Sequence, residues 1–371
     1  MSRKWRTSSL GLAAVLALAP AAACSSGDDA DAGNGGATSG PPAIAMSNSY
    51  DGNFYRQTMV KAWDLAVQDA TKQNLVGKNT VVNADNTANT QISQIQSMLV
   101  QDWNAIVINA ASATALNGVI QKACDQGIKV VVYDSITTAP CAYQVAFDYV
   151  ALGKQEAEYV AKRLNGKGNV LEIRGIAGTS VDDDIHKGVT EAFAAYPDIK
   201  IVGEVHGNWT KSVTQQAVDG ILPSLPQVDA VVTQGGDGTG AALAFQSAKR
   251  PLPIIIMGNR GDELRFWQEQ SASGYETIST SSAPGISSIA FWVAYLLTQG
   301  TEMPHTIPGP LISITTLDDA KKWIEATPPE GVATPVYNLD YTKKLVESAN
   351  SKSAPPDSPG PGDTGYVGVY S

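Results

Sequence analysis

From Ala43 onward, the sequence alternates short apolar runs with longer amphipathic segments. The short runs are rich in Val and Ile and mostly end in a polar residue or a glycine, which is typical of buried parallel strands; they are AIAMS, TVVNA, AIVIN, IKVVVYD, NVLEIRG, IKIVGEV, AVVTQ and PIIIMGN. Between them the apolar residues follow helical spacing, as in TQISQIQSMLVQDW, where Ile92, Ile95, Leu99 and Trp103 share one face. This alternation predicts an α/β fold with two doubly wound parallel sheets.

In such folds, ligands bind beyond the carboxyl ends of the strands, where loops lead into helices. The segments that follow the predicted strands are polar, aromatic and acidic, and none of them holds a cluster of lysines. This composition favours an uncharged, polyhydroxylated ligand over a phosphate. One of these loops, QGGDGTGA (Gln234–Ala241), resembles a dinucleotide-binding motif, but its glycines at 236, 238 and 240 do not fit G-x-G-x-x-G.

Motifs that would indicate an enzyme are absent from the sequence. Neither G-x-S-x-G nor H-E-x-x-H occurs, and the histidines at 186, 206 and 305 are scattered. The run VDDDIH, ending at His186, suggests either a metal site or a helix start capped by Ser180, with the aspartates at the positive end of the helix; we favour the cap. We therefore expect no catalytic residue, no metal and no cofactor.

The first 23 residues have the pattern of an export signal, since MSRKWR is basic and SSLGLAAVLALAPAAA is apolar. The run ends at Cys24 and resembles the lipobox of bacterial lipoproteins, in which that cysteine carries lipid; the alternative is a plain signal with an incidental cysteine. Residues 24–42 are predicted to be a disordered spacer and 351–371 a flexible tail. Removing residues 1–23 would move the net charge from −10 to −13, which argues against nucleic-acid binding.

The two remaining cysteines, Cys124 and Cys141, form an even pair in a chain that we expect to be exported. An oxidising compartment favours a disulfide between them. Two free buried thiols are the alternative.

The order of the loops that follow the strands resembles the type I periplasmic solute-binding proteins of ABC importers, in the ribose-binding-like branch. The resemblance covers about 43–300 and depends on the following stretches taken in order: NFYRQTMVKAWDLAVQDA, VVNADNTANTQISQIQSMLVQDWNAIVINA, IKVVVYDS, FDYVALGKQEAEYVAKRL, IRGIAGTS and AVVTQGGDGTGAALAF. It implies two lobes, residues 43–147 with 281–310 and residues 148–280 with 311–350. The crossings between the lobes, near 147–148, 280–281 and 311, would form a hinge.

The resemblance also implies a set of ligand-binding residues. Phe54 and Tyr55 match an aromatic pair that would sandwich a sugar ring from the first lobe, and Trp209 would face that pair from the second. Asn109 and Asp134 match side chains that bind hydroxyl groups. The full expected set is Asn53, Phe54, Tyr55, Asn109, Asp134, Asp184, Trp209, Asp237, Asn259 and Arg260.

Three places depart from the pattern of the family. Ser135 follows Asp134 where ribose-like binders often carry an arginine, and Ile185 stands where a second ligand-binding arginine would be expected. Asn259-Arg260 replaces an aromatic residue and an aspartate. Arg260 suggests two hypotheses. It either holds Asp237 and orients that carboxylate toward ligand hydroxyls, which we favour, or contacts an acidic ligand directly.

The sequence therefore predicts an exported receptor at the cell surface or in the periplasm, anchored by lipid at Cys24. It would act as a monomer and pass a small polar solute, such as a sugar or polyol, to an ABC permease. The alternative is a binding protein that signals to a membrane sensor. A sugar-responsive repressor would need a basic DNA-binding headpiece, whereas this N-terminus is a signal followed by an acidic spacer.

Overall fold

The computed structural model describes residues 40–365 and 369–370. The predicted signal 1–23, Cys24 and residues 25–39 of the predicted spacer lie outside the described residues. In the part of the chain that is described, no helix is both long and apolar enough to cross a membrane.

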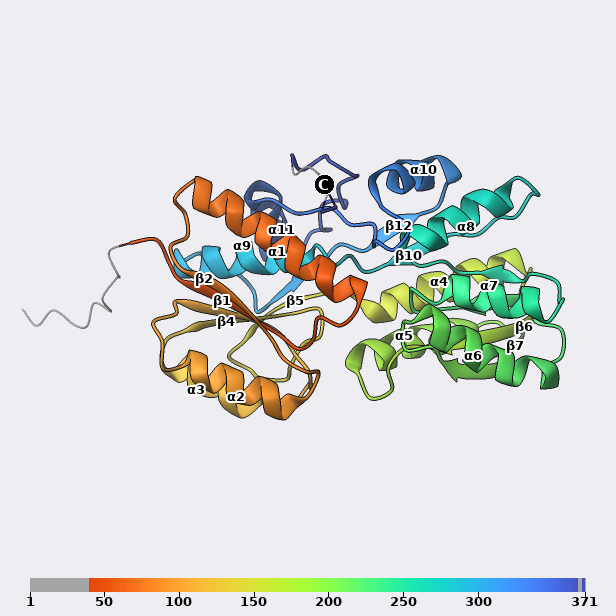
Figure 1. The fold of residues 1–371 in the computed structure, drawn as a ribbon, viewed down its shortest axis with the longest axis horizontal. Helices are drawn as coiled ribbons and strands as arrows, with labels where there is room; N and C mark the ends of the chain where they lie inside the picture. The colour runs from red at the N-terminus through yellow and green to blue at the C-terminus, as the bar shows by residue number, and fades with distance from the viewer. Residues whose placement is uncertain (1–39, 366–368, 371) are drawn as a thin grey trace, which may run out of the picture. The chain divides into compact units, whose positions relative to one another are not determined.

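The first sheet has six strands that all pair in parallel (Figure 1). Their spatial order is β11 (Thr306–Pro308), β5 (Tyr143–Ala146), β4 (Lys129–Tyr133), β3 (Ala105–Asn109), β1 (Ile44–Asn48) and β2 (Asn79–Asn83). Helices α1 (Phe54–Lys72), α9 (Ile286–Thr298) and α11 (Leu339–Ser351) cover one face, and α2 (Ala88–Met98) and α3 (Asn117–Asp125) cover the other. Strand residues alternate between the two faces, so Met46 packs in the α1–α9 core and its neighbour Ala45 in the α2–α3 core.

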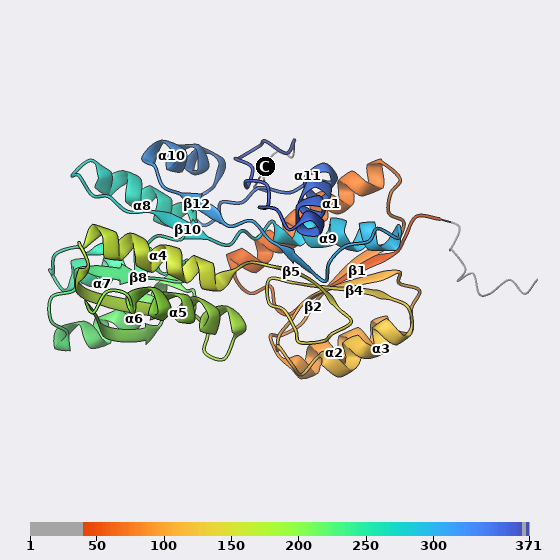
Figure 2. The same cartoon turned by 180° about the vertical axis from the view of Figure 1, so that it is seen from behind.

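The second sheet is parallel and has four strands, in the order β7 (Asp198–His206), β6 (Lys167–Arg174), β8 (Ala230–Val232) and β9 (Ile254–Ile255). Its covering helices are α4 (Tyr149–Arg163), α5 (Ser180–Phe193), α6 (Lys211–Ile221) and α7 (Gly238–Ser247), with a 3₁₀ turn η1 (Leu222–Ser224) after α6. Helices α4 and α5 lie side by side (Figure 2). They cross at Gly153 and Gly188, where an added Cβ would collide with the backbone of the other helix. The predicted pair of doubly wound parallel sheets is thus confirmed.

The chain passes between the two lobes four times, at 146–149, 281–286, 308–312 and 327–338. Next to two of these passages, β10 (Ser279–Ser281) and β12 (Ile312–Ile314) pair with each other antiparallel. The first three of these places coincide with the crossings that the sequence predicts, and the fourth was not predicted. Beyond β12, α10 (Leu317–Ala326) packs on α8 (Gly261–Ser271), which follows β9.

The C-terminal part of the chain differs from the sequence expectation in two ways. Helix α11 contacts α9 and β11 of the first sheet, although 311–350 was expected in the second lobe. The tail, expected to be flexible, has defined contacts: the Tyr370 hydroxyl accepts from the Val332 backbone N–H at 2.6 Å and lies 3.1 Å from the Thr58 hydroxyl. Tyr341 also donates to the Pro356 carbonyl at 3.0 Å.

Candidate functional site

A cavity of about 330 Å³ lies where the carboxyl ends of the strands of both sheets meet. This volume is within the range of small-molecule sites. Nearly every strand supplies part of the wall through the loop that follows it. The lining residues are Ser49, Tyr50, Asn53, Tyr55, Arg56, Asn86, Ala110, Ala111, Ser112, Ala113, Asp134, Ser135, Tyr149, Ile176, Ala177, Gly178, Thr179, Ser180, Val181, Trp209, Gln234, Gly235, Gly236, Asn259, Arg260, Ser281, Ser282 and Val332.

An ion pair between Arg56 and Asp134 forms one wall of this cavity. Arg56 Nη1 lies 2.7 Å from Asp134 Oδ2, and the Tyr149 hydroxyl donates to the other carboxylate oxygen at 2.6 Å. Burial works against the charge of Arg56, but the Asp134 carboxylate raises the pKa of the guanidinium. Arg56 is not among the ligand-binding residues expected from the sequence. It supplies the guanidinium that is missing beside Asp134, where Ser135 replaces the arginine of related binders.

Asn109 supports Asp134 from behind the cavity wall. It is fully buried, and its amide nitrogen donates to Asp134 Oδ2 at 3.1 Å and to the Tyr133 carbonyl at 3.2 Å. Its amide oxygen accepts from Ser49 at 2.8 Å. Asn109 therefore orients the carboxylate but does not line the cavity.

Of the expected aromatic pair at the start of α1, only Tyr55 lines the cavity. Asn53 caps the helix by accepting from the Arg56 backbone N–H at 2.9 Å, and both Asn53 and Tyr55 line the cavity. The Tyr55 hydroxyl lies 2.8 Å from Ser282 Oγ, a residue that follows β10. Phe54 is 47% exposed and does not line the cavity, because successive helical residues point in directions about 100° apart.

Trp209 and Arg260 lie together on the side of the second sheet. Trp209 has a left-handed backbone (φ 53°), and its indole packs where a Cβ on Gly175 would lie. The Arg260 guanidinium donates to the Trp209 carbonyl at 2.8 Å. The guanidinium also lies over Gly236, leaving no room for a Cβ at that position. This is the role of one glycine of the QGGDGTGA loop: it lets the arginine approach the backbone.

Asp237 of the same loop is fully buried and is not part of the cavity wall. Thr214 donates to its Oδ1 at 2.6 Å, and burial raises the pKa of Asp237 to about 8. Among the described residues, Asp237 Oδ2 has no hydrogen-bond partner. The favoured hypothesis that Arg260 holds Asp237 is wrong in this structure, because no ion pair joins Arg260 to any carboxylate of the described chain.

Asn259 and Gln234 are the amide side chains of the cavity wall in the second lobe. Asn259 is almost fully buried and donates to the carbonyls of Ser282 and Ala333, at 3.1 and 2.8 Å. Gln234 was not predicted; it accepts from the Gly175 backbone N–H at 3.0 Å through its amide oxygen. Both residues lie in loops that follow strands. Gln234 could therefore have been predicted from its position after β8.

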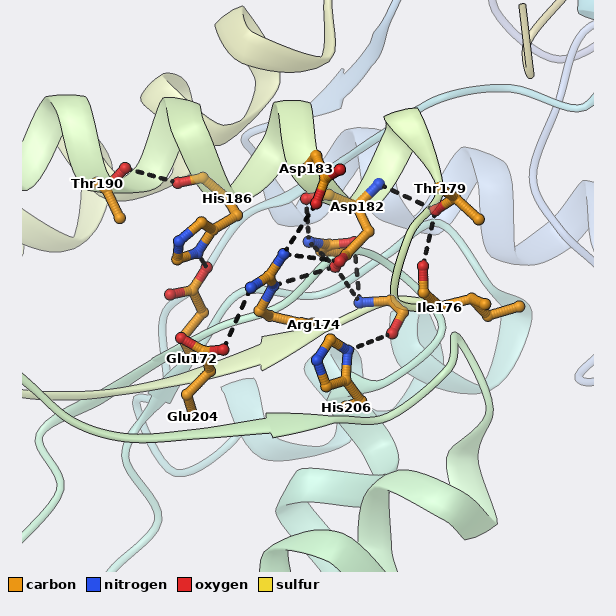
Figure 3. Close-up of polar contacts among 12 residues, drawn as sticks. Glu172, Arg174, Ile176, Thr179, Asp182, Asp183, His186, Thr190, Glu204 and His206 are labelled. Atoms are coloured by element: carbon orange, nitrogen blue, oxygen red, sulfur yellow. Dashed lines mark hydrogen bonds and ion pairs between the residues drawn. The ribbon is translucent and has the colours of Figure 1, made fainter. Parts of the chain in front are cut away.

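The VDDDIH run starts a helix, as the sequence predicts, but the cap is Thr179 instead of Ser180 (Figure 3). Thr179 accepts from the Asp182 backbone N–H at 3.3 Å. Asp182 is fully buried and receives two bonds from Arg174, at 2.7 and 3.2 Å. Asp184 does not line the cavity. Arg174 and Asp182 therefore fix the 176–181 loop, which does line it.

Glu172, His186 and Glu204 are the one group of possible metal ligands in the described chain, with a donor atom of each within 4.8 Å of the others. His186 Nδ1 lies 2.8 Å from Glu172 Oε1, and Arg174 donates to Glu204 at 3.2 Å (Figure 3). The Arg174 guanidinium therefore supplies the positive charge beside these carboxylates. The group also lies outside the cavity wall.

Cys124 and Cys141 form a disulfide with a Cα–Cα distance of 6.4 Å, which confirms the predicted pairing. It joins the end of α3 to the segment between β4 and β5. It therefore ties an outer helix of the first sheet to the segment that leads into β5, and neither cysteine lines the cavity.

Comparison with known proteins gives consistent matches. A family model described as a periplasmic binding protein domain matches residues 44–302. The crystal structure of an ABC transporter solute binding protein from Thermobispora bispora is 36% identical, with a TM-score of 0.79 over 86% of this chain and 99% of that one. A myo-inositol-bound solute binding protein from Bacillus halodurans shares the fold, with a TM-score of 0.68 at 19% identity over 78% of this chain and 99% of that one.

Two curated relatives match over shorter stretches. The xylitol-binding protein of Mycolicibacterium smegmatis is 34% identical over 177 residues, which are 47% of this chain and 51% of that protein. The ribose import binding protein of Salmonella typhimurium is 26% identical over 201 residues, 53% of this chain and 66% of that protein. The chain thus aligns with about half to two thirds of these relatives. They are binding proteins, and the predicted resemblance and type I fold are confirmed.

Proposed function

Since this chain belongs to the periplasmic binding protein family, whose members are extracytoplasmic, we propose that it is the solute-binding receptor of an ABC importer. The observation that supports this most directly is the cavity, to which the strand ends of both sheets contribute. A solute held there would contact the two lobes at once.

We propose a small polyhydroxylated solute. The cavity wall carries hydroxyl and amide groups, including Ser49, Ser282 and Asn259, and four aromatic residues, of which Tyr55 and Trp209 come from opposite lobes. Aromatic faces pack on the apolar C–H faces of a sugar or polyol while polar groups bind its hydroxyls. The xylitol-binding relative supports the same class of ligand.

Capture would work as a shift of population between open and closed forms. A ligand that bonds to both lobes stabilises the closed form, and the chain crossings between the lobes would serve as the hinge. The residues that we assign to binding are Asn53, Tyr55, Arg56, Asp134, Tyr149, Trp209, Gln234, Asn259 and Arg260, with Asn109 as support. No chemical step is needed for this role.

The closed form would deliver the solute to a membrane permease. We propose that residues 1–23 direct export, that Cys24 carries a lipid anchor, and that residues 25–42 connect the anchor to the folded monomer. Mass spectrometry of the membrane fraction tests the anchor, because a Cys24→Ala variant should lose the lipid mass and leave the membrane.

A thermal-shift screen of the exported protein against sugars, polyols and nucleosides tests the binding role, followed by calorimetry on the ligands that stabilise it. At a concentration of 100 times Kd, a ligand specific for the folded state contributes about 2.7 kcal/mol, a clear rise in melting temperature. A Tyr55→Ala, Trp209→Ala double variant should lose that rise. If no small solute stabilises the protein, the proposed function is contradicted.

A further inference from the structure

We infer that the solute is acidic: a small polyhydroxylated acid whose carboxylate binds Arg260. The inference deepens the proposed function and rests on it. It starts from the guanidinium, which lines the cavity and donates to the Trp209 carbonyl through Nη2. Within the described part of the chain, no carboxylate forms an ion pair with it, although its charge acts on the buried carboxyl groups of Asp237 and Glu263.

The charged residues of the cavity wall are Arg56, Asp134 and Arg260. Arg56 and Asp134 balance each other in a 2.7 Å ion pair. This leaves one positive charge at Arg260, in a chain whose formal net charge is −10. The local excess is therefore opposite in sign to the charge of the whole protein.

The two buried carboxyl groups behind Arg260 do not supply the missing partner. Asp237 bonds to Thr214, and burial raises its pKa to about 8, so its carboxyl group is largely protonated at neutral pH. Glu263 turns its carboxylate to the backbone instead, accepting from four N–H groups, those of Gly236, Gly238, Gly258 and Arg260. The guanidinium thus lines the cavity without a hydrogen bond to either of these carboxyl groups.

Helix α1 adds to the positive potential, because it begins at the cavity wall. Helix N-termini favour anions through their unpaired N–H groups and the helix dipole. Helix α5 also begins at the wall, but its first turn holds Asp182 and Asp183, which share the Arg174 guanidinium with Glu204 (Figure 3). The first turn of α1 holds no acidic residue.

A guanidinium presents parallel N–H groups that match the two oxygens of a carboxylate. The hydroxyl and amide groups of the remaining wall suit the rest of a polyol chain. Together they specify a sugar acid, such as an aldonate, more closely than the neutral alditol of the same length.

Matched ligand pairs test this directly. We would measure binding by calorimetry for xylonate against xylitol and for gluconate against glucitol, with wild type, Arg260→Gln and the control Arg163→Gln, an exposed arginine of α4. Because a hydrogen bond to a charged group contributes about 1.5–3 kcal/mol, each acid should bind wild type roughly 10- to 100-fold more tightly than its alditol. Arg260→Gln should remove that preference, and Arg163→Gln should keep it.

Salt gives a second readout, since the affinity for the acid should fall with ionic strength while that for an alditol stays nearly constant. If alditols or neutral sugars bind wild type as tightly as the acids, or if Arg260→Gln leaves the preference unchanged, the inference is overturned and the receptor function stands. If neither series binds, the inference fails together with the polyhydroxylated ligand class.

Discussion

Arg56 and Asp134 are 78 positions apart in the sequence, and their side chains meet at 2.7 Å in the wall of the cavity. Arg56 belongs to α1 on the first sheet, and Asp134 directly follows β4. Tyr149, which donates to the same carboxylate at 2.6 Å, opens the first helix of the second lobe. One carboxylate thus connects the first lobe to the place where the chain crosses to the second.

Asp134→Asn should destabilise the protein, because it leaves the Arg56 guanidinium without a charged partner in a mostly buried position. Breaking such a pair lowers the free energy of unfolding by roughly 3 kcal/mol, which urea titration can measure. Asp184→Asn is the control, since that carboxylate lies outside the cavity wall, and its effect should stay within about 0.5 kcal/mol. Equal losses in both variants would contradict the role given to the ion pair.

Trp209 and Phe54 should differ in their effect on affinity. Trp209 lines the cavity, whereas Phe54 is 47% exposed outside it. Trp209→Ala should weaken binding of the best ligand by about tenfold or more, and Phe54→Ala should leave it nearly unchanged. Calorimetry gives the affinities, and melting curves show whether Trp209→Ala has instead damaged the fold. A loss of affinity in Phe54→Ala would show that the closed form brings this ring to the ligand.

The disulfide between Cys124 and Cys141 closes a loop with a sequence separation of 17. Replacing both cysteines with serine should lower the free energy of unfolding by about 3 kcal/mol, as expected for a loop of this size. Affinity should not change, because neither cysteine lines the cavity. Thiol titration in denaturant on a Cys24→Ala background checks the bridge itself: two reactive thiols in the absence of reductant would exclude it.

Stability should fall as pH rises toward 8, in part because of Asp237. Burial raises its pKa to about 8, so the folded state holds the proton more tightly than the unfolded state. The stability from this group is complete below about pH 4 and is lost as pH rises through about 8. Buried Glu156, Glu172 and Glu263, whose pKa values burial also raises, act in the same direction.

Melting curves of Asp237→Asn from pH 5 to 9 isolate the contribution of this residue. The variant should lose less stability between pH 6 and 9 than wild type does. Asp219→Asn, at an exposed position of α6, serves as the control and should follow wild type. Identical pH profiles for wild type and Asp237→Asn would mean that Asp237 is already ionised in the folded protein.

The fold could be predicted because each strand and helix is indicated by the residues of its own short segment. Short apolar runs of Val and Ile specify buried strands, and the loops that follow them must meet at the same edge of a sheet. This reasoning placed Asp134, Trp209 and Asn259 at the cavity correctly. The same reasoning holds for Gln234, which also directly follows a strand.

The predictions that failed concern residues for which the direction of the side chain decides whether it reaches the cavity. Phe54 and Tyr55 are neighbours in sequence, yet one helical step turns the first away from the cavity. Arg56 lies within the first turn of α1, beyond the loop that directly follows the strand, and for this reason it was not predicted. The only indication in the sequence is Ser135, because it leaves Asp134 without a cation beside it in the chain. Asp237 follows a strand but enters the core, because Thr214 on α6 lies close enough to bond it.

The several chain passages between the two lobes restrict how one lobe can move against the other. A single linker would allow rotation about any axis. Here the strands next to two of the passages, β10 and β12, are hydrogen-bonded to each other, so twisting or sliding one half would stretch one passage against another. Bending about the passages is the movement that stretches them least. A captured solute then has fewer freedoms to suppress than one that joins two detached domains, so a larger part of its contact energy is kept as affinity.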